Sequence, residues 1–131
     1  MSSVILDSSA LLALIHNEPG CDVVKPLLPN AVMSSINIAE VIGILGARYK
    51  MPQNEITEMI EELIQTIISF NTAQAYIVGE IEKINRAQKL ALSLADKACI
   101  SLGELLNAPI YTADKAWAKV PILNAQIHLI R

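Results

Sequence analysis

Short apolar runs alternate along the chain with longer segments of helical pattern, and this alternation constrains the fold more than any other feature. The apolar runs predicted as strands are residues 4–6, 31–34, 67–70, 110–112 and 126–130. The segments predicted as helices are 8–15, 21–28, 36–49, 52–67, 73–89 and 96–106, with a short helical turn at 114–118. Such alternation is typical of a parallel sheet covered by helices on both faces. We therefore predict one domain over residues 1–131, a three-layer α/β/α fold with a mainly parallel sheet of four to five strands.

Four carboxylates lie where an apolar run meets a predicted helix or turn: Asp7, Glu40, Asp96 and Asp114. Each has an ordinary alternative as a helix cap, a solvated helix residue or a turn former. Together they are harder to dismiss, because an ionised acid without compensation is costly to bury. In open α/β sheets, ligands bind beyond the carboxyl ends of the strands. Acids gathered there would form an oxygen-rich pocket for Mg²⁺ or Mn²⁺, which predicts metal-dependent phosphate chemistry.

Short polar residues precede several of the helices and can cap them. The candidate caps are Ser8 or Ser9, Ser35 or Asn37, Asn71 or Thr72, and Ser93. Ser93 and Asp96 have the spacing of a capping box. The segment after Pro52 carries an apolar stripe from Ile56 to Ile67, which predicts a helix with one buried face.

The composition is apolar for a chain of 131 residues, with 53% hydrophobic residues and a mean hydropathy of +0.42. No apolar run reaches the roughly 20 residues needed to cross a bilayer, and nothing before Val4 is basic, as a signal peptide would require. Cys21 and Cys99 form no C-x-x-C motif and are expected to be small buried hydrophobic side chains, kept reduced in the cytosol. The excess of apolar residues predicts that another chain covers part of the surface.

Four sequence motifs, in order and nearly spanning the chain, resemble those of PIN-domain ribonucleases, with VapC toxins of toxin–antitoxin pairs as the most similar branch. They are VILDSSALLAL at 4–14 followed by EPG at 18–20, SSINIAEV at 34–41, LSLADKA at 92–98 and YTADKAW at 111–117. The resemblance implies a PIN-like fold and a Mg²⁺- or Mn²⁺-dependent endoribonuclease, in which acids hold the metal and a metal-activated water cleaves the RNA. It also implies a homodimer that is silenced by an antitoxin protein lying across the site.

Carried over residue by residue, the resemblance assigns the metal and the catalysis to Asp7, Glu40, Asp96 and Asp114. Ser8 or Thr112 would support these acids by hydrogen bonds. Nearby basic residues could contact RNA phosphates, although solvated surface is the alternative. They are Lys97, Lys115, Arg86 and Lys89.

The net charge leaves the partner open. A formal charge of −3 and a pI of about 5.3 argue against nucleic acid, but discounting the four site acids changes the balance to +1. Three alternatives to the toxin nuclease follow: a PIN nuclease of RNA processing, a catalytically inactive PIN-fold binding module, and a phosphatase with an aspartyl nucleophile. The last is disfavoured, because that chemistry pairs the first Asp with an acid two residues later, and Ser9 stands there.

Overall fold

The computed structural model describes residues 2–121 and 124–131, which are built around a sheet of five strands. The strands are β1 (Val4–Leu6), β2 (Ala31–Ser34), β3 (Thr66–Ile68), β4 (Ile110–Thr112) and β5 (Ile127–Leu129). Each neighbouring pair in the order β3-β2-β1-β4-β5 is parallel. The predicted α/β class and parallel sheet are therefore confirmed.

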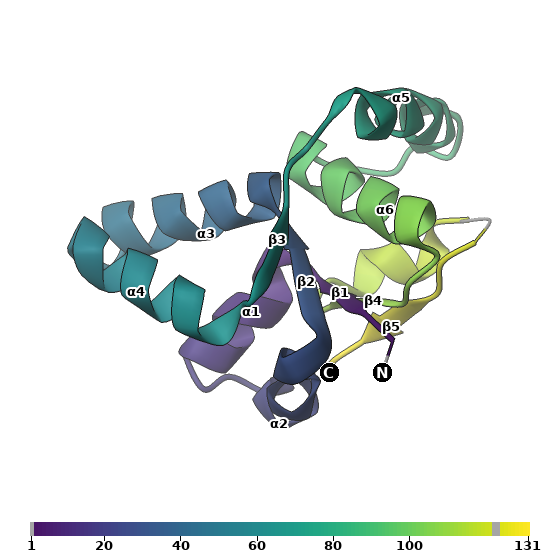
Figure 1. Cartoon of the computed structure of the whole chain (residues 1–131). Coiled ribbons are helices and arrows are strands. Elements are labelled where there is room, and N and C mark those ends of the chain that lie inside the picture. Colours follow the sequence, from purple (N-terminus) through teal and green to yellow (C-terminus); the bar gives the residue numbers. More distant parts are fainter. Residues whose placement is uncertain (1, 122–123) are drawn as a thin grey trace.

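Helices connect the strands and cover both faces of the sheet (Figure 1). They are α1 (Ser8–Ile15), α2 (Cys21–Val24), α3 (Ser35–Ala47), α4 (Gln53–Leu63), α5 (Thr72–Ala87) and α6 (Leu94–Leu106), with the 3-10 helices η1 (Lys25–Asn30) and η2 (Lys115–Lys119). The single helix predicted for 21–28 is divided into α2 and η1. Pro26 and Pro29 explain the division, because proline has no N–H to donate within a helix.

The helix predicted up to Ile67 ends earlier, because the chain must extend before it can join the sheet. Ile56 and Ile60 are buried on α4 as expected, but α4 stops at Leu63 and Ile64 has an extended backbone. Ile67 lies in β3, where it pairs with Met33 of β2. Strand pairing with β2 therefore overrides the helical pattern at the end of the stripe.

Two helices start directly at the end of a strand, and there the residue at the junction is the cap. Asp7 caps α1 by accepting a hydrogen bond from the N–H of Ala10 at 2.9 Å, and Ser34 caps α3. The predicted caps Ser8 or Ser9, and Ser35 or Asn37, were therefore wrong. The cap of α5 by Asn71 and the capping box of Ser93 with Asp96 are confirmed.

Alternate side chains of β1 belong to two separate cores. Leu6 packs with α1, α3 and α4 on one face of the sheet, and Ile5 packs with α5 and α6 on the other. Both cysteines are free thiols, and Cys99 is buried in the second core as expected. The expectation of burial was wrong for Cys21, which is only partly buried. The two-sided burial of so short a strand explains its continuous apolar sequence.

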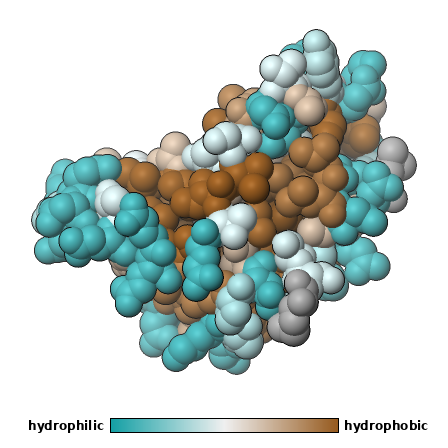
Figure 2. All heavy atoms as spheres, in the orientation of Figure 1, coloured by the Kyte–Doolittle hydropathy of each residue, from teal (hydrophilic) through white to brown (hydrophobic). Residues whose placement is uncertain are grey.

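Some hydrophobic side chains remain on the surface. Figure 2 shows hydrophobic residues gathered across the centre of one face, over α3, β3 and α6. Leu94 at the start of α6 is 59% exposed, and Ile67 of β3 is 41% exposed. Across the part of the chain that the structure describes, no helix combines the length and apolarity needed to span a membrane.

Gly103 lies where α6 packs tightly on β4, and we expect Gly103→Ala to destabilise the fold by about 1–3 kcal/mol. A Cβ atom there would clash with the Ile110 side chain, which is fully buried in β4. Gly79 of α5 is the matched control, since a Cβ there meets nothing within 4 Å and Gly79→Ala should stabilise the helix by about 0.5–1 kcal/mol. Urea unfolding of both variants measures the contrast; equal stability would contradict the close packing of α6 on β4.

Candidate functional site

The strand order places a crevice between β1 and β4. The chain moves outward from β1 to β2 and β3, then returns to the other side of β1 to form β4 and β5. Such a reversal is where ligands bind in open α/β sheets. Asp7 follows β1, and Asp114 lies two residues after Thr112, the last residue of β4. The register pairs Leu6 with Tyr111, which brings Asp7 beside Thr112.

Asp7 is held by three donors, although it is only 5% exposed. The hydroxyl of Thr112 donates to its Oδ2 at 2.6 Å, and the hydroxyl of Ser9 donates to its Oδ1 at 2.7 Å. The N–H of Ala10 also donates to Oδ1. Ser9 in turn accepts from the N–H of Ala113 at 2.9 Å. These bonds fix one orientation of the carboxylate between β1 and β4.

Burial nevertheless dominates the titration of Asp7, and it raises the pKa of this carboxyl from 3.8 to about 6. The hydrogen bonds from Thr112, Ser9 and Ala10 oppose the shift, because they stabilise the ionised form. The negative charge of Asp96 raises the pKa further. Asp7 is therefore a carboxylate that lacks enough compensating positive charge.

All four predicted acids line one pocket of about 210 Å³. Asp96 lies in the first turn of α6, Glu40 on α3, and Asp114 at the cap of η2. Burial raises the pKa of Asp96 and the charges of Glu40 and Asp114 raise it further, while hydrogen bonds with Ser93 oppose the rise. The four acids thus come from four elements, and their charges interact across the pocket.

Asn37 also lines this pocket, and the sequence did not point to it as a site residue. It is 1% exposed, and its Nδ2 donates to Oγ of Ser8 at 3.3 Å and to the carbonyl oxygen of Ala95 at 3.1 Å. Ser8, expected to support an acid, instead donates to the backbone oxygen of Asn37. Asn37 therefore ties α3 to the starts of α1 and α6. Its position three residues before Glu40, on the same face of α3, is the signal that could have identified it.

We expect Asn37→Ala to lower the free energy of unfolding by about 1–3 kcal/mol, because it leaves the partly buried carbonyl of Ala95 without this donor. Asn54→Ala on the exposed surface of α4 is the control and should change stability by less than about 0.5 kcal/mol. Urea midpoints compare the two variants. If Asn37→Ala is as stable as Asn54→Ala, the link between the three helices contributes nothing.

The donor set fits a hard divalent cation that keeps part of its water shell. Within the described residues, no three His, Cys, Asp or Glu side chains are grouped closely enough to hold an ion directly. Mg²⁺ usually binds proteins through one or two carboxylates and several waters, so a wider ring of acids suits it. In addition, Oδ1 of Asn37 is buried without a hydrogen-bond partner in the structure. The pocket thus offers acidic and amide oxygens, and charge repulsion that a cation would relieve.

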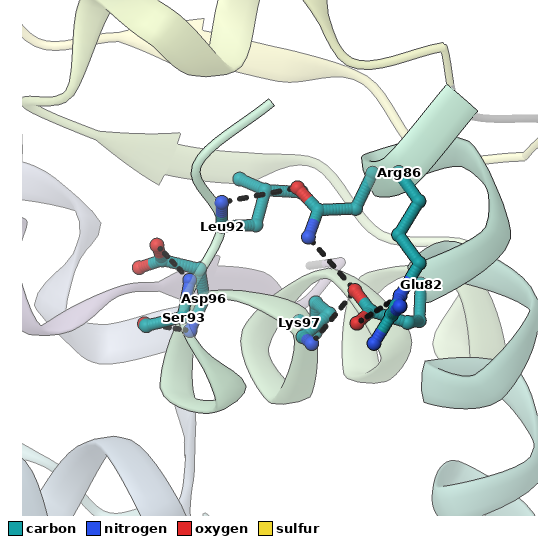
Figure 3. A network of polar contacts seen from close by, with 7 residues as sticks. Glu82, Arg86, Leu92, Ser93, Asp96 and Lys97 are labelled. Atoms are coloured by element: carbon teal, nitrogen blue, oxygen red, sulfur yellow. Dashed lines mark hydrogen bonds and ion pairs between the residues drawn. The ribbon is translucent and has the colours of Figure 1, made fainter. Parts of the chain in front are cut away.

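The predicted RNA-contacting residues divide into two groups. Lys97 is mostly buried and donates to Oε1 of Glu82 at 3.1 Å, and Arg86 pairs with the same carboxylate. Figure 3 shows Lys97 directed toward Glu82 on α5, away from its neighbour Asp96. RNA contact by Lys97 stays a prediction that would require this ion pair to open. Lys89 and Lys115 are exposed.

A comparison with protein-family models matches residues 4–123 to the PIN domain. The chain belongs to the PIN domain family. No curated protein matches its sequence significantly.

Solved structures of toxin–antitoxin complexes share the fold at low sequence identity. A chain of VapBC-1 from nontypeable Haemophilus influenzae is 24% identical with a TM-score of 0.73, and the match covers 97% of both chains. DNA-bound VapBC from Salmonella typhimurium gives 15% identity and a TM-score of 0.77 over 100% of both chains. VapBC2 from Rickettsia felis, bound to promoter DNA, gives 19% identity and a TM-score of 0.75, and the match covers 96% of this chain and 97% of that one.

Proposed function

We propose that this PIN-domain protein is a Mg²⁺- or Mn²⁺-dependent endoribonuclease and the toxin of a toxin–antitoxin pair. The observation that carries the proposal is the convergence of Asp7, Glu40, Asp96 and Asp114 on one pocket at the crevice of the sheet. Family membership supports a nuclease, and the similarity to VapBC structures supports the toxin.

Each acid has a distinct part in the proposed site. Asp7 is the fixed ligand, since Thr112 and Ser9 hold both of its oxygens in place. Asp96 is oriented by its capping box, while Glu40 and Asp114 lie at the exposed rim. A divalent ion held by these residues would supply Lewis-acid chemistry: it would lower the pKa of water and offset the negative charge that develops on the phosphate.

The proposed partners follow from the charges and apolar surface around the same site. RNA is the proposed substrate, and the exposed Lys89 and Lys115 would bind its phosphates. A cognate antitoxin is the proposed inhibitor, with a guanidinium that pairs with the pocket carboxylates. Homodimer formation and a cytoplasmic location remain part of the proposal, and the exposed Leu94 and Ile67 offer apolar surface for a second chain.

The test is cleavage of a fluorescent RNA by Asp96→Asn compared with Glu58→Gln, an exposed acid on α4. We expect Asp96→Asn to lose at least about a hundredfold in rate, because it removes a charge that acts on the ion, and Glu58→Gln to keep the parent rate. EDTA should stop cleavage, and Mg²⁺ or Mn²⁺ should restore it. Undiminished cleavage by Asp96→Asn, or cleavage in EDTA, would refute the proposed site. The alternative of an inactive binding module predicts binding of RNA or of an antitoxin-like peptide, without cleavage under any condition.

A further inference from the structure

A second hollow, of about 320 Å³, lies against the acidic pocket and shares Asp114 with it. It is lined by Lys89, Leu90, Ala91, Leu92, Asp114, Ala116 and Lys119. Apart from the shared Asp114, its charged residues are two lysines, so its character is opposite to that of the acidic pocket. A cationic hollow thus adjoins the proposed cleavage site.

The two lysines reach this hollow from elements far apart in sequence. Lys89 follows the end of α5, and Lys119 is the last residue of η2. Both are exposed, and among the described residues neither forms an ion pair. By contrast, Arg86 and Lys97 nearby are already paired with Glu82. Lys89 and Lys119 are therefore free to bind an anionic ligand.

The wall that carries Lys89 is held in place by hydrogen bonds to α5. Oδ1 of Asn85 accepts from the N–H of Leu92 at 3.1 Å, and Nδ2 of Asn85 donates to Glu82 at 2.8 Å. Lys97 joins the same Glu82 carboxylate from α6 (Figure 3). The segment between α5 and α6 is thus tied to α5, which is itself linked to α6, and the backbone position of Lys89 is set before any ligand binds.

Lys89 also occupies a backbone position that favours glycine. Its φ is 55°, and the N–H of Leu90 donates to the carbonyl of Asn85 while that of Lys89 donates to the carbonyl of Arg86. This is the Schellman arrangement, in which glycine is the usual residue. Lys50 has a similar φ of 59° and lines no described pocket of this site, so the strain alone assigns no function. Lys50 therefore provides a matched control for replacing a lysine by glycine at such a backbone position.

We propose that Lys89 and Lys119 bind the RNA phosphate adjacent to the one that is cleaved. The inference rests on the proposed nuclease function and adds a substrate subsite to it. An RNA strand whose scissile phosphate lies at the acidic pocket must continue past the rim of that pocket. Asp114 lies on this rim and is common to both hollows, so the second hollow is next along one path of the strand. Lysine ammonium groups there would offset the repulsion between the RNA backbone and the acids, and Leu90 and Leu92 offer apolar surface to the sugars.

The test measures RNA binding by fluorescence anisotropy, with a labelled single-stranded RNA of mixed sequence and the full chain carrying Asp96→Asn to prevent cleavage. Added to this background, Lys89→Gly with Lys119→Gln should weaken binding roughly tenfold. The slope of log affinity against log salt should fall by about 0.7 for each lysine. Lys50→Gly should leave affinity and slope unchanged, and both glycine variants should melt no lower than their parent, because glycine suits their backbone.

Parent-like RNA affinity and salt dependence in the double variant would overturn the subsite. The same result is expected if the lysines bind an acidic protein segment instead of RNA. Failure of the nuclease proposal has a different signature. If the unmodified chain cuts no RNA with Mg²⁺ or Mn²⁺ but the double variant still loses RNA affinity, the lysines bind RNA phosphate, but the nuclease proposal falls and the site is no longer a subsite of cleavage. If the chain cuts RNA but the double variant binds normally, only the subsite falls.

Discussion

Asp7→Asn should reduce RNA cleavage at least about a hundredfold while leaving a metal-free protein that is at least as stable as the parent at pH 7.5. The substitution removes a negative charge from a buried site and keeps the shape of the side chain. Ionisation of Asp7 is unfavourable in the fold, since burial raises its pKa from 3.8 to about 6. That difference corresponds to roughly 3 kcal/mol, which is the upper limit of the expected gain in stability.

The hydrogen bonds around Asp7 can accommodate the amide. Oδ1 of an asparagine would keep the bonds from Ser9 and Ala10, and its Nδ2 would donate to Oγ1 of Thr112, which now donates to Asp7. Loss of at least about a hundredfold in cleavage is expected, because the ligand charge is gone. Thermal melting and an RNA cleavage assay measure the two effects. An active variant, or one that is inactive only because it is unfolded, would contradict this role of Asp7.

The metal-free protein should lose stability as the pH rises from 5 to 7, and Mn²⁺ should restore it. Folded Asp7 has a pKa of about 6 against an ordinary value of 3.8, so the folded state holds more protons than the unfolded state between these values. Stability therefore falls as the pH rises through this window, by about 1 kcal/mol between pH 5 and pH 7 for Asp7 alone. The raised pKa of Asp96 acts in the same direction.

A cation in the pocket reverses this dependence, because it binds the ionised acids. At a concentration about a hundredfold above its dissociation constant, Mn²⁺ should stabilise the fold by about 2.7 kcal/mol, or roughly 10 °C in melting temperature. The increase should be larger at pH 7 than at pH 5. Differential scanning calorimetry in EDTA and in Mn²⁺ measures it, with Asp7→Asn as the control. An equal increase in Asp7→Asn would place the ion elsewhere, and no increase would favour an inactive binding module.

The three central strands of the sheet could be predicted from the sequence because they are largely buried on both faces. Val4–Leu6, Ala31–Ser34 and Ile110–Thr112 are continuous apolar runs closed by polar residues, and the structure has them with the predicted bounds. The end of α4 could not be predicted, because the apolar pattern continues into β3 and only pairing with β2 separates the two elements.

The convergence of the acids was predictable from strand ends, but their environment was not. That Asp7 caps α1 depends on the chain turning without a loop, and a pattern of serines cannot decide this. The links from Asn37 to Ser8 and Ala95 join residues that are 29 and 58 positions apart. Likewise, the pairing of Lys97 with Glu82 depends on the packing of α5 against α6, which motif spacing does not encode.

Anomalous scattering from crystals soaked in Mn²⁺ tests most directly whether the four acids form a cation site. We expect a manganese peak in the pocket between Asp7, Glu40, Asp96 and Asp114, coordinated by at least one of these carboxylates and by water. The peak should vanish in crystals of Asp7→Asn. Fully occupied manganese outside this pocket, or none bound at saturating concentration, would contradict the account.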